Sequence, residues 1–135
     1  MAKPARSPDD ACPCGRAAWA ACCGRFIGTG VPAPDAESLM RSRYSAFVRG
    51  HADHLRATWH PDHCPADLTP DAAVRWLGLE VRGHRVTGPD TAEVEFVARS
   101  RIHGRGQRLH ERSRFVREGG LWYYVDGDFP SEDKR

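Results

Sequence analysis

The sequence predicts an α+β fold in which helices pack on a curved antiparallel sheet, preceded by a small cysteine-rich module. Four of the five cysteines lie within residues 12–24. Apolar residues then recur with helical spacing, and after Trp76 they alternate with polar residues, which is typical of half-buried strands. A chain of 135 residues is long enough for one ordinary domain and a small appendage.

The cysteines form two close pairs, Cys12/Cys14 and Cys22/Cys23. Two thiolate pairs separated by a short loop can supply the tetrahedral four-sulfur site that zinc accepts. The alternative is a disulfide or a set of reduced thiols, although neighbours such as Cys22 and Cys23 are poorly placed to pair with each other. The clustered spacing favours one structural zinc ion bound by all four cysteines.

The composition limits the classes of function. Hydrophobic residues make up 40% of the chain, and four Trp, five Phe and three Tyr can build a core. The net charge of +2 does not favour nucleic-acid binding. No apolar run approaches the length of a membrane span, and residues 1–10 lack a signal peptide's apolar segment. We therefore expect a cytoplasmic protein that contacts no membrane.

The chain divides into four parts by composition. Residues 1–11 are polar and without apolar pattern, which predicts disorder, and residues 12–31 hold the cysteine module. A connector rich in glycine and proline at 26–34 should run extended into the main domain, residues 32–128. Residues 129–135 are expected to form a flexible tail.

The first helix is predicted at residues 36–49, with Asp35 as its N-cap and Gly50 as its C-terminal stop. On a helical wheel, Arg43 falls in the middle of the apolar face. That face consists of Ala36, Leu39, Met40, Tyr44 and Phe47. The opposite side carries Ser38, Arg41, Ser42, Ser45 and Arg49. A buried arginine is costly unless a carboxylate meets it, so Arg43 is either paired inside or extends to the rim.

Two shorter helices and four strands should follow. A helix over 52–59 is ended by Pro61, and Thr69-Pro70-Asp71 predicts a third helix near 70–76. The alternating segments predict strands at Leu77–Val81, Ala92–Arg99, Arg108–Phe115 and Leu121–Asp126.

The turns between the strands predict which residues face each other. Gly119-Gly120 is a two-residue hairpin signal, which would place Phe115 opposite Tyr124 and Ser113 opposite Asp126. A turn at Gly104-Arg105 would likewise place Phe96 opposite Ser113, and Ala98 opposite Glu111. The covered face then contains Val94, Phe96, Ala98, Leu109, Phe115, Trp122 and Tyr124, together with the polar Glu111, Ser113 and Asp126. The other face carries Glu95, Arg99, His110, Arg112 and Arg114, and is expected to be solvated or to form a dimer surface.

Several segments resemble one bacterial family. They are Leu39–Phe47, Thr58–Pro61, Val94–Ala98, Glu111–Phe115 and Trp122–Gly127. These strings are similar to the YchJ-like proteins, and residues 12–24 resemble the SEC-C zinc knuckle found at the end of the translocation ATPase SecA. The resemblance implies an NTF2-like cone, in which helices cover a concave sheet, joined to an N-terminal zinc knuckle. It implies no activity, because no biochemical role is established for the family.

The predicted cone brings polar groups into an apolar interior. The expected pocket residues are Arg43, Tyr44, Trp59, His60, Glu111, Ser113, Trp122, Tyr124 and Asp126. We expect Arg43 to meet Glu111 there. Glu111 and Asp126 are candidates for acid/base catalysis, but a buried pair that only fixes the helix on the sheet perturbs pKa values as well.

The loop after the second helix holds His60, His63 and Cys64, whose side chains have metal-ligand chemistry. Three donors fall short of a closed site, and histidines that lie incidentally in a loop are the alternative.

Two functions remain. The first is a zinc-bearing binding or adaptor protein, whose knuckle contacts a protein partner and whose cone holds a small ligand. The second is a cone-pocket enzyme of the isomerase, dehydratase or hydrolase type. The sequence favours the first, because it contains a metal motif and no complete catalytic constellation.

Overall fold

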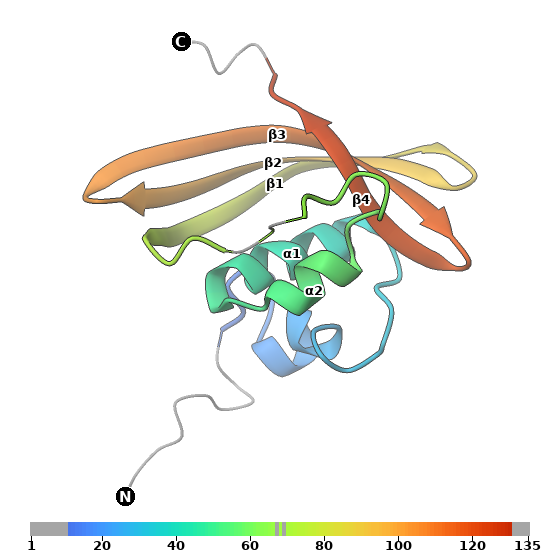
Figure 1. Ribbon diagram of the computed structural model, residues 1–135, viewed down its shortest axis with the longest axis horizontal. Helices are drawn as coiled ribbons and strands as arrows, with labels where there is room; N and C mark the ends of the chain where they lie inside the picture. Colours follow the sequence, from blue (N-terminus) through green and yellow to red (C-terminus); the bar gives the residue numbers. More distant parts are fainter. Residues whose placement is uncertain (1–10, 67, 69, 131–135) are drawn as a thin grey trace, which may run out of the picture.

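The computed structural model describes residues 11–66, 68 and 70–130, and its elements form three layers (Figure 1). A four-stranded sheet is covered on one face by α1 (Ala36–Arg49) and α2 (Ala52–Ala57). The cysteine module, which we call the knuckle (residues 12–31), lies on the far side of α1 from the sheet. Its 3-10 turns span Trp19–Ala21 and Cys23–Arg25.

The two ends of the chain lie largely outside the residues that the structure describes. The predicted disorder falls on residues 1–10 and the predicted tail on residues 131–135, none of which is described. Ala11 is described, and it forms an isolated β-bridge with Ala18. In the part of the chain that the structure covers, no helix has the length and apolar content needed to cross a membrane.

The first helix has the predicted bounds. The side chain of Asp35 accepts a hydrogen bond from the backbone N–H of Ser38 at 2.7 Å, which satisfies a donor that the first turn leaves unpaired. Gly50 ends the helix with φ 77°, a left-handed conformation that glycine adopts without penalty. The second helix begins at Ala52 as predicted but already ends at Ala57.

The predicted third helix is wrong. The carboxylate of Asp71 accepts a hydrogen bond from the N–H of Ala73 at 2.9 Å, so this segment is a turn, and a strand begins at Val74. The ring of Trp76 packs against Tyr44 and Phe47 with centroid separations of 5.5 and 6.0 Å. This packing on α1 favours the strand over the local helix-start signal, whose Thr69 lies outside the described residues.

The sheet is antiparallel in the order β1-β2-β3-β4. Its strands are β1 (Val74–Gly88), β2 (Thr91–Ile102), β3 (Arg105–Glu118) and β4 (Leu121–Asp128). All four predicted strands are present, and each is longer than the alternating pattern indicated.

The register between β2 and β3 differs from the prediction by two residues. The turn lies at His103 and Gly104, both with positive φ, and Phe96 therefore faces Glu111 instead of Ser113. A shift of two residues keeps every side chain on its predicted face, because side chains alternate with a period of two.

The register between β3 and β4 changes the face of one candidate residue. Phe115 faces Tyr124 as predicted, but an irregularity between Arg114 and Phe115 places Asp126 opposite Arg114. Such a bulge sets two residues of one strand against one of its neighbour. Asp126 is thereby turned to the outer face of the sheet.

The knuckle and the cone share one hydrophobic cluster. It contains the four knuckle cysteines, Ala36, Leu39, Met40 and Tyr44 of α1, and Ala92, Val94, Phe96, Ala98 and Phe115 of the sheet. The knuckle therefore has no core of its own and packs as part of the core of the main domain.

Candidate metal centre and cone pocket

The four knuckle cysteines converge on one point. Their sulfur atoms all lie within 4.8 Å of one another, and Cys14 Sγ is 3.4 Å from Cys22 Sγ. A tetrahedral zinc site with Zn–S bonds of about 2.3 Å requires sulfur separations of roughly 3.8 Å. Each cysteine is at most 4% exposed. The donor set and its spacing therefore fit a closed four-sulfur metal centre.

The electrostatics of the cluster favour a bound cation. Hydrogen bonds from Cys14 and then Cys23 hold the pKa of Cys12 far below its ordinary value. Burial raises the pKa of Cys22 to about 11, and hydrogen bonding to Cys12 raises that of Cys23. The Cys12 thiolate is thus stabilised at the expense of Cys22 and Cys23, and a bound cation would favour ionisation of those two sulfurs as well.

The backbone and the neighbouring helix hold the cluster in place. Gly15, at φ 85°, donates its N–H to the carbonyl of Cys12 at 2.9 Å and closes the first turn. From α1, Ser45 Oγ lies 3.4 Å from Cys12 Sγ. Arg41 Nη1 donates to the carbonyl of Cys14 at 3.2 Å. The side of α1 opposite the cone is therefore occupied by the knuckle.

Trp19, in the loop between the two cysteine pairs, completes the contact with α1. The guanidinium carbon of Arg49 lies 3.9 Å from the centroid of the Trp19 ring. A Cβ atom at Gly24 would lie 2.6 Å from Trp19 Nε1, so only glycine permits this ring position. Sequence analysis missed both contacts, since neither follows a local spacing rule.

A second site lies inside the cone, between α1 and the concave face of the sheet. It is a pocket of about 230 Å³. Its lining consists of Met40, Arg43, Tyr44, Phe47, Trp59, Trp76, Phe96, Ala98, Leu109, Glu111, Ser113, Phe115 and Tyr124. Six of the nine expected pocket residues are in this lining, and His60, Trp122 and Asp126 are not.

Glu111 is the acidic group of this pocket. The residue is 9% exposed, and its Oε2 accepts hydrogen bonds from Ser113 Oγ and Tyr124 OH, each at 2.8 Å. A Cβ atom at Gly127 would lie 2.7 Å from Glu111 Cδ. The carboxylate thus fills the space that a side chain on the neighbouring strand would take. Gly127 is a site residue that the sequence analysis did not identify.

Arg43 enters the cone from α1, as its helical phase predicted. Its Nη1 donates to the carbonyl of Leu55 at 2.9 Å and to Thr58 Oγ1 at 2.7 Å. Its guanidinium carbon lies 5.0 Å from the centroid of the Trp59 ring and 4.7 Å from that of Tyr124. Burial lowers the pKa of Arg43 to about 10.

The expectation that Arg43 pairs directly with Glu111 is wrong, as these contacts show. Tyr124 contacts both groups, with its ring against the guanidinium and its hydroxyl on the carboxylate. Burial, and then the charge of Glu111, raises the pKa of Tyr124. The phenol therefore stays protonated and donates to Glu111 at neutral pH.

Asp126 does not belong to the pocket. Its carboxylate accepts a hydrogen bond from Arg114 Nε at 2.6 Å, and Arg114 Nη1 donates to Asp128 at 2.7 Å. These groups form a partly exposed ion-pair network on the outer face. The expectation of a second acid/base candidate inside the cone is wrong, because the bulge reverses the face of Asp126.

His60 and Trp122 also lie elsewhere. The ring of His60 extends toward β3, where Nε2 is 3.1 Å from Glu118 Oε2, and it meets His63 at 5.9 Å between ring centroids. Trp122 stacks with Arg117. Among the described residues, the four knuckle cysteines are the one group of three or more ligand-type side chains close enough to share a metal. His60, His63 and Cys64 thus form no second metal site there.

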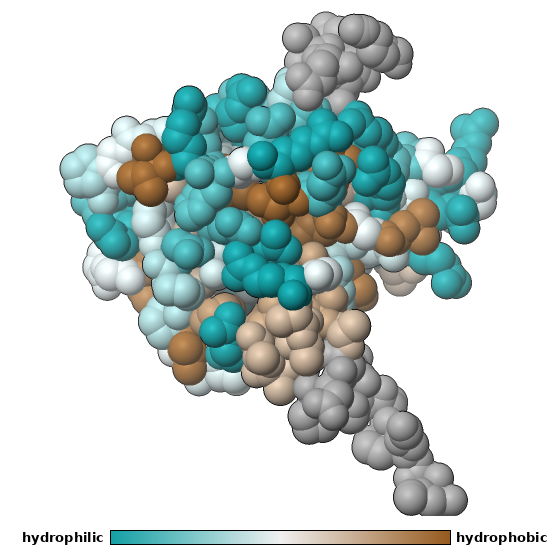
Figure 2. Space-filling view, turned by 180° about the vertical axis from the view of Figure 1, so that it is seen from behind, coloured by the Kyte–Doolittle hydropathy of each residue, from teal (hydrophilic) through white to brown (hydrophobic). Residues whose placement is uncertain are grey.

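The outer face of the sheet is less solvated than expected. The side chain of His110 is 0% exposed, and its Nε2 lies 2.7 Å from Glu95 Oε2. Val97 is also fully buried. Figure 2 shows the molecule from behind, where strongly hydrophobic groups are scattered among hydrophilic ones. The most exposed large hydrophobic residues, Val86 and Phe129, lie on β1 and just beyond β4.

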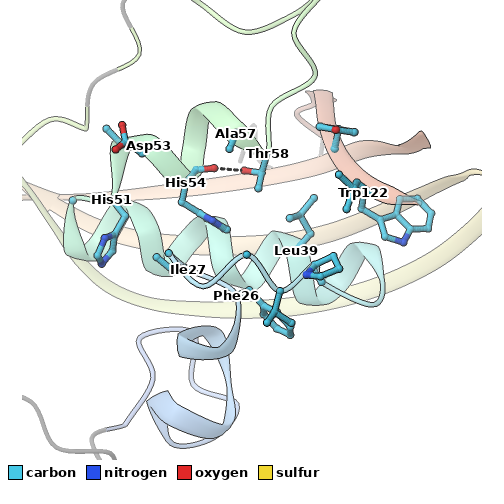
Figure 3. A pocket seen from close by; sticks show the side chains of 18 residues that line it. Phe26, Ile27, Leu39, His51, Asp53, His54, Ala57, Thr58 and Trp122 are labelled. Carbon is cyan, nitrogen blue, oxygen red and sulfur yellow. Dashed lines mark hydrogen bonds between the residues drawn. The ribbon is translucent and has the colours of Figure 1, made fainter. Parts of the chain in front are cut away.

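A groove of about 650 Å³ runs between the connector, α2 and the start of β4. Figure 3 shows Phe26 and Ile27 of the connector around it, with Leu39 of α1 and His54 of α2. His54 Nε2 lies 2.8 Å from Ser42 Oγ. Burial lowers the pKa of His54 to about 4, so this imidazole is neutral at physiological pH. Nothing in the sequence indicates that His54 is a partly buried, hydrogen-bonded imidazole, because it is a single histidine in a short helix.

The α+β fold, the cysteine cluster and the cone pocket together define a class of protein in which a cysteine knuckle is attached to an NTF2-like domain. The model of the family described as YchJ, middle NTF2-like domain, matches residues 35–127. A UPF0225 protein of Methylibium petroleiphilum is 65% identical over 118 residues, which are 87% of each chain. A UPF0225 protein of Cupriavidus pinatubonensis is 55% identical and covers 96% of both chains. The chain belongs to this YchJ-like, UPF0225 family.

Solved structures agree with this assignment. The solution structure of a SEC-C motif containing protein from Rhodopseudomonas palustris has a TM-score of 0.80 at 31% identity. It covers 89% of this chain and 98% of its own. The crystal structure of a SEC-C motif containing protein from Psychrobacter arcticus has a TM-score of 0.74 at 27% identity, covering 91% and 84% of the two chains.

Proposed function

We propose that this chain is a zinc-binding protein in which the metal fastens the knuckle to α1, while the cone pocket binds a small organic ligand. The observation that carries the metal assignment is the convergence of four buried cysteine sulfurs within 4.8 Å. Four protein ligands leave no position for water, so the zinc is structural. SEC-C motif neighbours support the same assignment.

Metal analysis tests the first half. The full chain, purified without added metal, should contain one zinc per chain. Replacing Cys22 and Cys23 by serine should abolish it, and Cys64→Ser is the matched control, because Cys64 lies apart from the cluster. Absence of zinc from the parent protein, or zinc that survives the double change, would contradict the assignment.

The second half of the proposal, that the chain binds a small organic ligand, rests on the cone pocket. A cavity of about 230 Å³ beside two buried charged side chains is unusual for a plain core, because interiors are close-packed and apolar. Toluene is a suitable probe for the apolar walls. We expect it to shift the indole NMR signals of Trp59 and Trp76, which line the pocket. Filling the pocket with Ala98→Leu should abolish the effect.

An acid/base enzyme is the second candidate, and one observation favours it. Tyr124 OH lies 2.8 Å from the Glu111 carboxylate, which sets a proton donor beside an acceptor in the cone pocket. Both hydrogen bonds fall on Oε2, so among the described residues Oε1 is left to accept a proton from a ligand, and Glu111 would serve as a general base. An enzyme would convert its bound ligand and lose that conversion in Glu111→Gln while still binding toluene.

The proposed macromolecular partners follow from the exposed surfaces. The inner side of the knuckle is occupied by α1, so a protein partner would meet its outer side, where Ala17, Ala20 and Ala21 are exposed. A homodimer through the outer sheet face is the other proposal, and sedimentation velocity tests it. With a net charge of +2, nucleic acid is not among the proposed partners, and binding should vanish at moderate salt.

A further inference from the structure

We infer that the cone pocket selects an electrically neutral ligand: a single ring bearing a polar end that both accepts and donates hydrogen bonds, as an aryl amide does. This inference rests on the proposed function of the pocket. It comes from the inventory of donors, acceptors and charges around the cavity.

The size and walls of the cavity set the body of the ligand. At about 230 Å³, the pocket is smaller than the 300–1,000 Å³ typical of sites for drug-sized molecules. Most of its walls are apolar or aromatic, formed by Met40, Tyr44, Phe47, Trp76, Phe96, Ala98, Leu109 and Phe115. Such walls suit one flat apolar ring.

Glu111 supplies the acceptor. Both hydrogen bonds to its carboxylate fall on Oε2, and within the described part of the chain Oε1 accepts none. A carboxylate removed from water is stabilised by further donors. A ligand in this pocket should therefore direct an N–H or O–H group at Glu111.

Arg43 supplies the donor. Its Nη1 is committed to Leu55 and Thr58, whereas Nε and Nη2 have no hydrogen-bond partner among the residues that the structure describes. The residue is only 6% exposed, so bulk water reaches it poorly. A ligand that places a carbonyl oxygen near Arg43 would satisfy a guanidinium that the protein leaves partly unpaired.

The two charges together decide the charge of the ligand. Arg43 and Glu111 line the same small cavity, which therefore carries no net charge. An anion attracted by Arg43 would be repelled by Glu111, and the reverse holds for a cation. Either ion would also lose its hydration on entry. A neutral amide can use both groups at once, with its carbonyl on Arg43 and its N–H on Glu111.

Three probes of nearly equal shape test this inference: benzamide, benzoate and benzamidinium. Each is titrated into the full, zinc-loaded chain, and the indole signals of Trp59 and Trp76 report binding. We expect benzamide to bind at least 10-fold more tightly than either ion. In Glu111→Gln the pocket keeps only the positive charge, so benzoate should become the preferred probe. Asp126→Asn, a carboxylate change on the outer face, should leave the order unchanged.

The outcomes separate this inference from the proposed function. If toluene binds but benzoate or benzamidinium matches benzamide in the parent protein, the neutral-ligand inference is overturned while the binding pocket stands. If neither toluene nor benzamide binds, both fail. The ranking in the parent protein decides the matter even if Glu111→Gln does not fold.

Discussion

The two faces of α1 are both covered, but by different chemistry. Toward the sheet, Arg43 and Tyr44 line a cavity. Toward the knuckle, Ser38 and Ser45 are buried and contact Arg16 and Cys12. A row of serines is usually the solvated side of an amphipathic helix. Here the small side chains instead allow the knuckle to approach closely, and the serines of the polar face are buried.

The two faces also differ in what stabilises them. The sheet supplies apolar area to one face through long strands. The knuckle is too short to bury a core of its own, so its contact with the other face depends on the cysteine cluster. Destabilising the knuckle should therefore destabilise α1, whereas changes in the cone should alter the pocket directly.

The largest effect should come from breaking the knuckle side. Replacing Cys22 and Cys23 by serine should lower the free energy of unfolding of the whole chain by at least about 3 kcal/mol, because structural metal binding contributes to folding free energy. Denaturation followed by circular dichroism should show α1 losing stability along with the knuckle. An unchanged transition of the helix and sheet would show that the two parts are independent.

On the cone side, Arg43→Met and Glu111→Leu should each cost about 2–4 kcal/mol, since each leaves buried polar groups without a partner. If the two residues were bonded directly, the double variant would recover most of that loss. Because Tyr124 lies between them, we expect it to recover no more than about 1 kcal/mol. If urea denaturation shows that the double variant recovers most of the lost unfolding free energy, the direct pair that the sequence suggested would be supported after all.

A smaller effect should follow from Gly127→Ala. The added Cβ would displace the Glu111 carboxylate, and overpacking of this kind costs about 1–3 kcal/mol. In a Glu111→Ala background the same change should cost less than about 0.5 kcal/mol, because the space is then free. Gly106→Ala is the matched control, since nothing lies within 4 Å of a Cβ at that position. Equal losses in both backgrounds would contradict the contact.

The smallest effect concerns His54 of α2, whose Nε2 lies 2.8 Å from Ser42 Oγ of α1. With the pKa of His54 lowered to about 4 in the folded protein, the unfolded chain takes up a proton near pH 6.5 before the folded chain does. Stability should thus be complete above pH 7 and fall as the pH drops from 6.5 to 4. His54→Gln keeps a donor for Ser42 without titrating.

The difference in unfolding free energy between parent and His54→Gln should therefore change by about 1–2 kcal/mol over that range, allowing for the partial exposure of the ring. Thermal melts of both proteins at pH 7 and pH 4.5 measure it. Parallel pH profiles would show that the imidazole is not held neutral.

The sequence by itself determined the features that act over a few residues. Asp35 and Gly50 define α1, because a capping side chain and a left-handed glycine satisfy backbone groups locally. The spacing of the four cysteines predicts the cluster, since two short turns bring the sulfurs together. Alternation of apolar residues predicts four strands, and helical phase places Arg43 in the cone.

Only the tertiary structure decided the rest, because it depends on contacts between distant segments. A bulge beside Arg114 turns Asp126 outward, and no local pattern marks where a ladder slips by one residue. Packing of Trp76 on α1 converts a helix-start signal into a strand. The knuckle contacts Ser38 and Ser45 of α1 only because the folded chain brings these distant segments together. Arg43 contacts Tyr124 and does not pair directly with Glu111, because buried polar groups interact with the nearest partners that packing provides.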